Sequence, residues 1–110
     1  MNKSSLTALG RVQLKAARSA SNGRASKTVY GGHEHSLRQT VIALIDGQEL
    51  HEHENPGEAT VHVLEGRVEL RAGEVTWKGS PGDLLFVPDE RHSLAAMKDS
   101  VVLLTVAKRG

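Results

Sequence analysis

The sequence predicts an all-β domain, a sandwich or a barrel, preceded by a short helical extension. Three observations favour this class. From Thr28 onward, short apolar stretches alternate with turns about every eight to twelve residues. The turns are built from Gly, Pro, Asn and Asp, and no helical periodicity interrupts the pattern.

The extension begins with Ser4 and Ser5, either of which can cap a helix that runs to about Ala20. A loose apolar stripe supports that helix, formed by Leu6, Leu9, Leu14 and Ala17. Residues 19–26 are small and polar and include a glycine, which is typical of a linker. We therefore divide the chain into a helix and linker, residues 1–27, and a β-domain, residues 28–110.

The β-domain contains strands that alternate in polarity where both faces can be recognised. Val68 and Leu70, and again Val75 and Trp77, place apolar side chains on one face. The predicted strands are 29–32, 37–45, 50–53, 60–64, 67–71, 75–78, 84–87, 93–97 and 101–107.

Composition narrows the class further. The 110 residues contain no cysteine, which excludes disulfides, thiolate metal sites and cysteine nucleophiles and suits a reducing, cytoplasmic compartment. No apolar run approaches the roughly 20 residues of a membrane helix, and no secretory signal is recognisable. With one Trp, one Tyr and one Phe, the core must rest on aliphatic side chains, and a homodimer would help so small a domain to bury surface.

Charge is distributed unevenly. Residues 1–27 hold six basic residues and no acid, whereas residues 28–110 hold eight basic residues and thirteen acids. A basic arm of this kind could contact nucleic acid or anionic lipid, and it resembles an organelle transit peptide. Because the six charges are scattered, we expect instead a helix that packs on its own acidic body or on a partner subunit.

The residues most informative about chemistry are three histidines. His51 and His53 are two positions apart, so on an extended strand they point to the same face. His92, from a later stretch, would complete a set of neutral nitrogen donors suited to Zn, Fe, Mn, Ni or Cu. Three protein nitrogens with open positions are typical of a catalytic metal site.

These residues fall into two motifs that resemble those of the cupin superfamily. The first comprises Gly47, His51, His53 and Gly66, the second Gly82, Pro88 and His92, and the resemblance covers roughly residues 37–107. It implies a small jelly-roll barrel (a double-stranded β-helix), commonly dimeric, with the histidines inside. It also implies a small-molecule ligand or, in an enzyme, metal-dependent oxygenase or isomerase chemistry.

The sequence departs from that pattern at the carboxylate ligand. The family's Glu would stand seven residues before Gly66, where this chain has Ala59. Glu58 is adjacent, but alternation aims it at the opposite face unless a bulge intervenes. The metal shell is therefore at most three histidines, and the alternative is a metal-free pocket in which the histidines hydrogen-bond a ligand or water.

Other candidates have plainer explanations. Arg38 can reach a carboxylate or phosphate of a ligand, or form a structural ion pair. His33 and His35 suggest an exposed segment or a subunit contact, and His62 alternates with valines and faces away from the pocket. Trp77 and Phe86 are expected in the core. The acidic run of Glu52, Glu54 and Glu58 is expected to be solvated.

Two functional hypotheses follow. In the first, the barrel binds a small oxygenated metabolite in a pocket lined by His51, His53, Ala59, His92 and Arg38, with a divalent metal held by the three histidines. In the second, the protein is a non-catalytic dimerisation or sensor module without metal, and the basic N-terminal arm contacts the partner. Nucleic acid and membrane are not expected partners.

Overall fold

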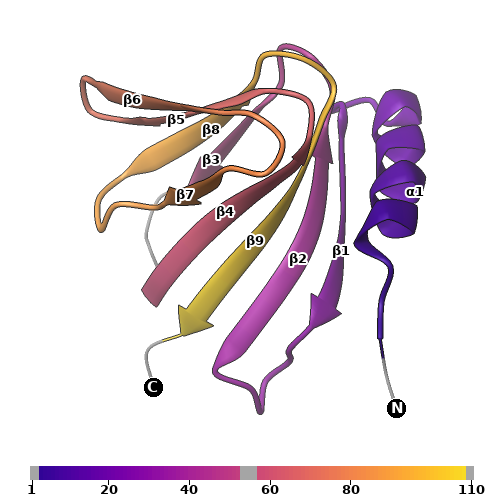
Figure 1. The fold of residues 1–110 in the computed structure, drawn as a ribbon, viewed down its shortest axis with the longest axis horizontal. Coiled ribbons are helices and arrows are strands. Elements are labelled where there is room, and N and C mark those ends of the chain that lie inside the picture. Colours follow the sequence, from indigo (N-terminus) through magenta and orange to yellow (C-terminus); the bar gives the residue numbers. More distant parts are fainter. Residues whose placement is uncertain (1–2, 53–56, 109–110) are drawn as a thin grey trace.

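The computed structural model describes residues 3–52 and 57–108 and contains one helix and two antiparallel sheets (Figure 1). The five-stranded sheet has the order β1-β2-β9-β4-β7, and the four-stranded sheet the order β3-β8-β5-β6. The elements are α1 (Leu6–Ser19), β1 (Arg24–Tyr30), β2 (Leu37–Leu44), β3 (Glu49–Glu52), β4 (Gly57–Glu65), β5 (Val68–Ala72), β6 (Val75–Gly79), β7 (Leu84–Phe86), β8 (His92–Ala96) and β9 (Ser100–Lys108). The all-β jelly-roll class is confirmed.

The inner faces of the two sheets enclose a core that is entirely aliphatic, as the composition predicted. Alternate residues of each strand point inward, and the most deeply buried large side chains include Leu44 and Leu70, each about 1% exposed. The barrel core comprises Ile42, Leu44, Val61, Val63, Val68, Leu70, Leu85, Leu94, Ala96 and Val102.

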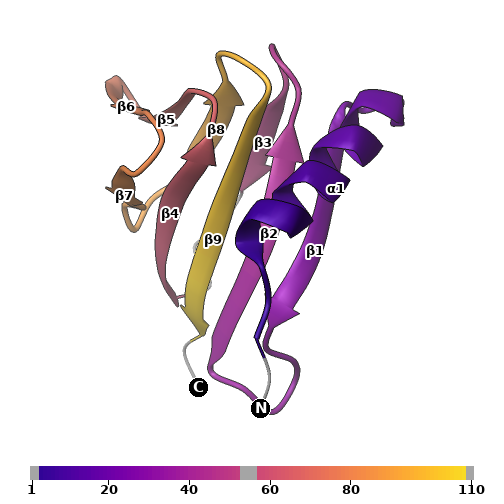
Figure 2. The same cartoon turned by 45° about the vertical axis from the view of Figure 1, so that its right-hand side comes forward.

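Helix α1 lies on the outer face of the five-stranded sheet (Figure 2). It begins as predicted, because the Ser5 Oγ accepts a hydrogen bond from the Ala8 N–H at 3.2 Å. Leu14 and Ala17 are buried against β2 and β9 in a second apolar cluster, the helix-side cluster: Leu14, Ala17, Val41, Ala43, Val101 and Leu103. Over residues 3–52 and 57–108, no helix has the length and apolar character needed to cross a membrane.

The first strand starts earlier than expected. β1 begins at Arg24, inside the segment interpreted as a linker, and pairs along β2. Its polar residues misled the sequence interpretation because β1 is an edge strand whose solvent side tolerates them.

The expectation that Trp77 and Phe86 belong to the core was wrong. Trp77 is opposite Leu70 and so lies on the inner face, but β6 is an edge strand and the side chain is 41% exposed. Phe86 is opposite Thr60 on the outer face, because its neighbour Leu85 takes the inward position, and it is 75% exposed.

Candidate ligand site at the mouth of the barrel

A small cavity lies between the two sheets inside the barrel core. Its volume is about 20 Å³, enough for about one water molecule. It is lined by Ile42, Leu50, Val61, Leu70, Val87, His92, Leu94, Val102 and Leu104. Of the described residues that line it, His92 alone has a polar side chain.

β8 positions this histidine. His92 is its first residue and alternates with Leu94 and Ala96, both of which belong to the barrel core. The imidazole Nδ1 lies 2.9 Å from the carbonyl oxygen of Glu90. A carbonyl oxygen can only accept, so this contact is a hydrogen bond in the tautomer that carries its proton on Nδ1 and its lone pair on Nε2. His92 therefore presents an acceptor, or a nitrogen ligand, at the edge of an apolar cavity.

His51 does not point where the sequence hypothesis put it. In β3 the neighbouring Leu50 packs on the barrel core and pairs with Leu94, so His51 points out of the barrel. Its side chain is 67% exposed, and its Nε2 lies 3.9 Å from the Glu49 Oε2. His53 lies outside the described residues. The three-histidine set thus stays a prediction, with His51 on the opposite face of the sheet from the cavity.

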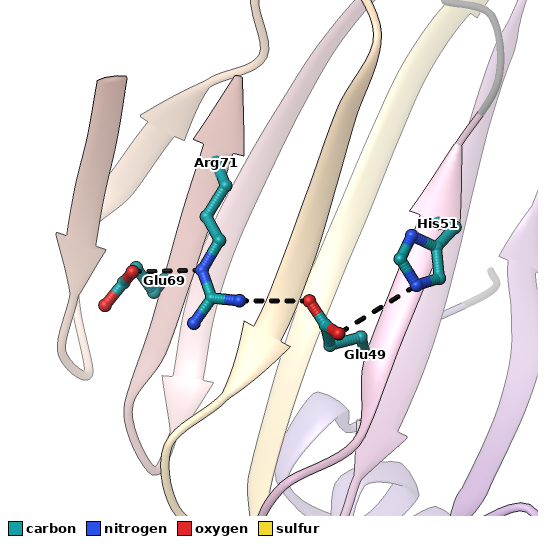
Figure 3. A network of polar contacts seen from close by, with 4 residues as sticks. All are labelled: Glu49, His51, Glu69 and Arg71. Atoms are coloured by element: carbon teal, nitrogen blue, oxygen red, sulfur yellow. Dashed lines mark hydrogen bonds and ion pairs between the residues drawn. The ribbon is translucent and has the colours of Figure 1, made fainter. Parts of the chain in front are cut away.

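On that outer face His51 belongs to a network of polar side chains that links it to Glu49, Arg71 and Glu69, shown in Figure 3. Arg71 donates from Nε to Glu69 at 3.0 Å and from Nη1 to Glu49 at 3.1 Å. The register places Ser93 and Ala95 of β8 between β5 and β3, and these short side chains let Arg71 reach across. Because Arg71 and Glu49 are more than a third exposed, such pairs add little stability.

An open groove of about 600 Å³ runs beside these polar side chains. It is lined by Glu49, His51, Arg71, Gly73, Glu90, Arg91, His92 and Ser93. His92 therefore borders both the interior cavity and the outer groove, and His51 only the groove. The groove carries acids and bases in similar numbers and has no preference for one sign of charge.

Arg38 and Ala59, predicted to line the pocket, do lie on the inner face. Both pair with Val106 of β9 and so form one row across the sheet. On the same face, the neighbouring row consists of Thr40, Leu104 and Val61. Arg38 is exposed and Ala59 half-buried, whereas Val61 is buried. They therefore belong to the rim where the barrel opens.

The apolar residues of the site were not predicted from the sequence. Leu50, Val87 and Leu104 line the cavity but were not singled out. Leu104 pairs with Thr40, which lies on the same face of β2 as Arg38, so alternation along the two strands would have indicated it. Glu58 and His62 pair with outward residues of β9, so both face away from the cavity, as alternation predicts.

The described residues do not assemble a metal shell. Within residues 3–52 and 57–108, no group of three or more His, Asp or Glu side chains is placed to hold an ion. Ala59 supplies a methyl group where a carboxylate ligand would stand, and His51 points to the opposite face of the sheet from the cavity that His92 lines.

Comparisons with known proteins agree with this architecture. A family model described as "Cupin domain" matches residues 40–107. A conserved protein of unknown function from Streptococcus pyogenes is 29% identical, with 83% of this chain and 79% of that chain covered and a TM-score of 0.72. An RmlC-like cupin protein from Desulfovibrio desulfuricans is 27% identical, with coverage of 76% and 81% and a TM-score of 0.66.

The similarity in fold extends to the N-terminal helix. A structure of unknown function from Rhizobium leguminosarum is only 18% identical, yet it covers 99% of this chain and 98% of its own, with a TM-score of 0.71. The comparison with curated proteins found no match.

Proposed function

The chain belongs to the cupin family, and from that premise we propose that it binds a small molecule with an apolar body and an anionic end at the mouth of its barrel. The observation that carries the proposal is His92: a single imidazole with its lone pair on Nε2, at the edge of a cavity otherwise lined by aliphatic side chains. An apolar surface with a few fixed polar groups is the usual composition of a small-molecule site.

The volume of the cavity limits how such a ligand can sit. Ligand pockets usually measure about 300–1,000 Å³, so a cavity of about 20 Å³ can admit a methyl group but not a whole metabolite. The body of the ligand must therefore rest on Leu50, Val87 and Leu104. Its polar groups would then remain at the rim.

Arg38 gives the rim its positive charge. Its row on the inner face is the next one out from Leu104, and its side chain is exposed. A guanidinium binds a carboxylate through two parallel hydrogen bonds, which favours an anionic end over a neutral one. A hydroxyl or a second donor of the ligand would meet the His92 Nε2.

A metal-assisted form of the same site is the second candidate. Cupins often bind divalent metals. The hydrogen bond from Nδ1 to the Glu90 carbonyl is the kind of contact that orients metal-bound imidazoles. When bound, a divalent metal would supply Lewis-acid chemistry at the anionic end of the ligand. Elemental analysis of untagged protein, with and without His92→Ala, decides between the two forms.

The direct test uses hexanoate and hexan-1-ol, which share an apolar body and differ in charge. Isothermal calorimetry should detect hexanoate binding to the wild type and weaker binding of the alcohol. Arg38→Gln should weaken hexanoate binding about tenfold, and His92→Ala should weaken hexan-1-ol binding about tenfold, the loss expected for one charge-assisted or buried hydrogen bond, because the hydroxyl can donate to Nε2 and a carboxylate cannot. Arg38→Gln should also remove the preference for hexanoate over the alcohol.

His33→Ala is the matched control, because His33 is an exposed histidine remote in sequence from both motifs. It should bind hexanoate and hexan-1-ol as the wild type does. The proposal fails if the wild type binds neither probe, or if His92→Ala binds hexan-1-ol with unchanged affinity.

A further inference from the structure

A crevice separates the two sheets along one side of the barrel. β1 is an edge strand of the five-stranded sheet, and β3 is an edge strand of the four-stranded sheet. The crevice between them has a volume of about 260 Å³ and is lined by Asn22, Arg24, Ala25, Ser26, Ile42 and Leu50. Ligand pockets usually begin at about 300 Å³, so this crevice suits a molecule of a few non-hydrogen atoms.

The register gives the crevice a polar wall and an apolar floor. Arg24 pairs with Leu44 of the barrel core, so its side chain lies on the inner face of the sheet. Ser26 pairs with Ile42 and lies on the same face. Ile42 and Leu50 form the floor, and both also line the interior cavity. The crevice and the cavity are therefore neighbours that share these two side chains as a common wall.

The polar groups of the crevice are hydrogen-bond donors. The Asn22 Oδ1 already accepts from the backbone N–H of Arg24 at 3.2 Å, which leaves the side-chain amide of Asn22 to donate. The Ser26 hydroxyl can also donate, and a guanidinium can do nothing else. Of the described residues that line the crevice, none is Asp or Glu. Donors and a positive charge without a neighbouring carboxylate favour an anionic ligand.

The Arg24 guanidinium is available to such a ligand. Two other arginines are engaged within the chain, because Arg18 pairs with Asp99 and Arg71 with Glu49. By contrast, no carboxylate within residues 3–52 and 57–108 forms an ion pair with Arg24. Arg24 is half-buried, and charges in such places are screened less by solvent and salt than fully exposed charges are.

We propose that this crevice binds a short-chain carboxylate. Arg24 holds the carboxylate through two parallel hydrogen bonds, and the alkyl chain lies on Ile42 and Leu50. The apolar floor selects such a ligand over inorganic phosphate, which is anionic but has no apolar surface to bury.

The crevice is distinct from the mouth of the barrel. Arg24 lies beside Leu44, six residues along β2 from Arg38. At about 3.3 Å per residue, the two arginines are about 20 Å apart along the strand direction, so one short ligand cannot reach both. The crevice therefore does not depend on the site at the mouth, and each can fail without the other.

The first test is an NMR titration of the full chain with butyrate. The chain contains two isoleucines, whose methyl signals report on opposite faces of one sheet: Ile42 lines the crevice, and Ile45 packs against the helix-side cluster. Butyrate should shift the Ile42 methyl signal and the backbone amide signal of Ala25, and it should leave the Ile45 methyl signal largely unchanged. Inorganic phosphate at the same concentration should shift these signals much less.

Variants of Arg24 assign the binding, with affinity measured from the Ala25 amide signal. Arg24→Gln should weaken butyrate binding about tenfold, the loss of one charge-assisted contact. Arg24→Lys keeps the charge but not the two parallel donors, so its affinity should lie between those of the wild type and Arg24→Gln. Lys27→Gln is the matched control, because Lys27 is exposed on the same strand and pairs with Val41 on the outer face. It should bind butyrate as the wild type does.

Arg38→Gln distinguishes the crevice from the mouth of the barrel. It should leave the butyrate-induced shift of Ala25 unchanged, because the two arginines lie at opposite ends of the inner face. Loss of that shift in Arg38→Gln but not in Arg24→Gln would mean that butyrate binds at the mouth alone. That result would overturn the crevice site and leave the function proposed for the mouth intact.

Three further outcomes would overturn the proposal. Butyrate could leave the Ala25 amide signal unshifted at about 100 mM, well above the dissociation constant of even a weak site. Arg24→Gln could bind butyrate as tightly as Lys27→Gln does. Phosphate could bind as tightly as butyrate with the same dependence on Arg24, which would make the apolar floor irrelevant to the ligand.

Discussion

The carboxylate of Asp99 joins three parts of the chain. Its Oδ1 accepts from the backbone N–H of Asp46 at 2.9 Å, and its Oδ2 accepts from the Arg18 Nε at 3.2 Å. The turn before β9 is thereby tied to the turn after β2 and to the last turn of α1. The Asp46 hydrogen bond lowers the pKa of Asp99, partial burial opposes that effect, and Arg18 lowers the pKa further.

A lowered pKa fixes the sign of the pH dependence. The folded state holds the Asp99 proton less tightly than the unfolded state does. The contribution of Asp99 to the free energy of unfolding is therefore complete above the ordinary carboxyl pKa and is lost as the pH falls through the lowered value. Asp99→Asn should therefore reduce the free energy of unfolding by about 1 kcal/mol at pH 7, a modest figure for a hydrogen-bonded group at the surface. Urea denaturation at pH 7 and at about pH 2.5 measures both values, and a difference that persisted at the acidic pH would contradict this account.

At the scale of the element, the turn between β4 and β5 explains a glycine of the first motif. Gly66 has a φ of 86°, and a Cβ there would lie 2.7 Å from the Cα of Ser100. Ser100 is buried, and its Oγ accepts a hydrogen bond from the Arg67 N–H at 3.0 Å. The motif glycine thus allows one turn to pack directly on β9. Its role in the fold is structural.

Gly66→Ala should lower the free energy of unfolding by about 3 kcal/mol, because it combines a left-handed backbone with a steric clash against backbone atoms. Gly47 is the matched control. Its φ is 88°, but a Cβ at this position would meet no other atom within 4 Å, so Gly47→Ala should cost only about 1 kcal/mol. Equal losses in urea denaturation would mean that the close approach to Ser100 contributes nothing.

At the scale of the whole molecule, turn spacing and alternation predicted the sheets, but they did not determine which face of each strand points inward. His51 shows the difficulty. Alternation puts His51 and His53 on one face and Leu50 on the other, but it does not say which of the two faces points inward, and in the structure it is that of Leu50. Phe86 was misplaced for the same reason, because Leu85 takes the inward position, whereas Trp77 faces inward but lies on an edge strand, and the sequence does not show where a sheet ends. His92 and Ala59 were predicted in the pocket from their places in the two motifs, and Arg38 from its place in an apolar strand, and the register puts all three on the inner face.

The five-stranded sheet separates two apolar clusters, and this separation should make the helix and the ligand site energetically independent. Odd-numbered residues of β2, such as Val41, pack under α1, while even-numbered residues, such as Ile42, line the cavity. Contacts on one face reach the other only through the backbone of the sheet. Stability supplied by α1 can therefore change without moving the side chains of the site.

Leu14→Ala tests that independence. Leu14 is 5% exposed in the helix-side cluster, so its truncation should lower the free energy of unfolding by about 3 kcal/mol. The imidazole NMR signals of His92 should keep their wild-type positions. Leu70→Ala, a truncation of the same size in the cavity wall, should destabilise the fold similarly but shift those signals, because Leu70 and His92 line one cavity. If Leu14→Ala shifted the His92 signals as much as Leu70→Ala does, the sheet would be transmitting strain between its faces, and α1 would have to be counted as part of the ligand site.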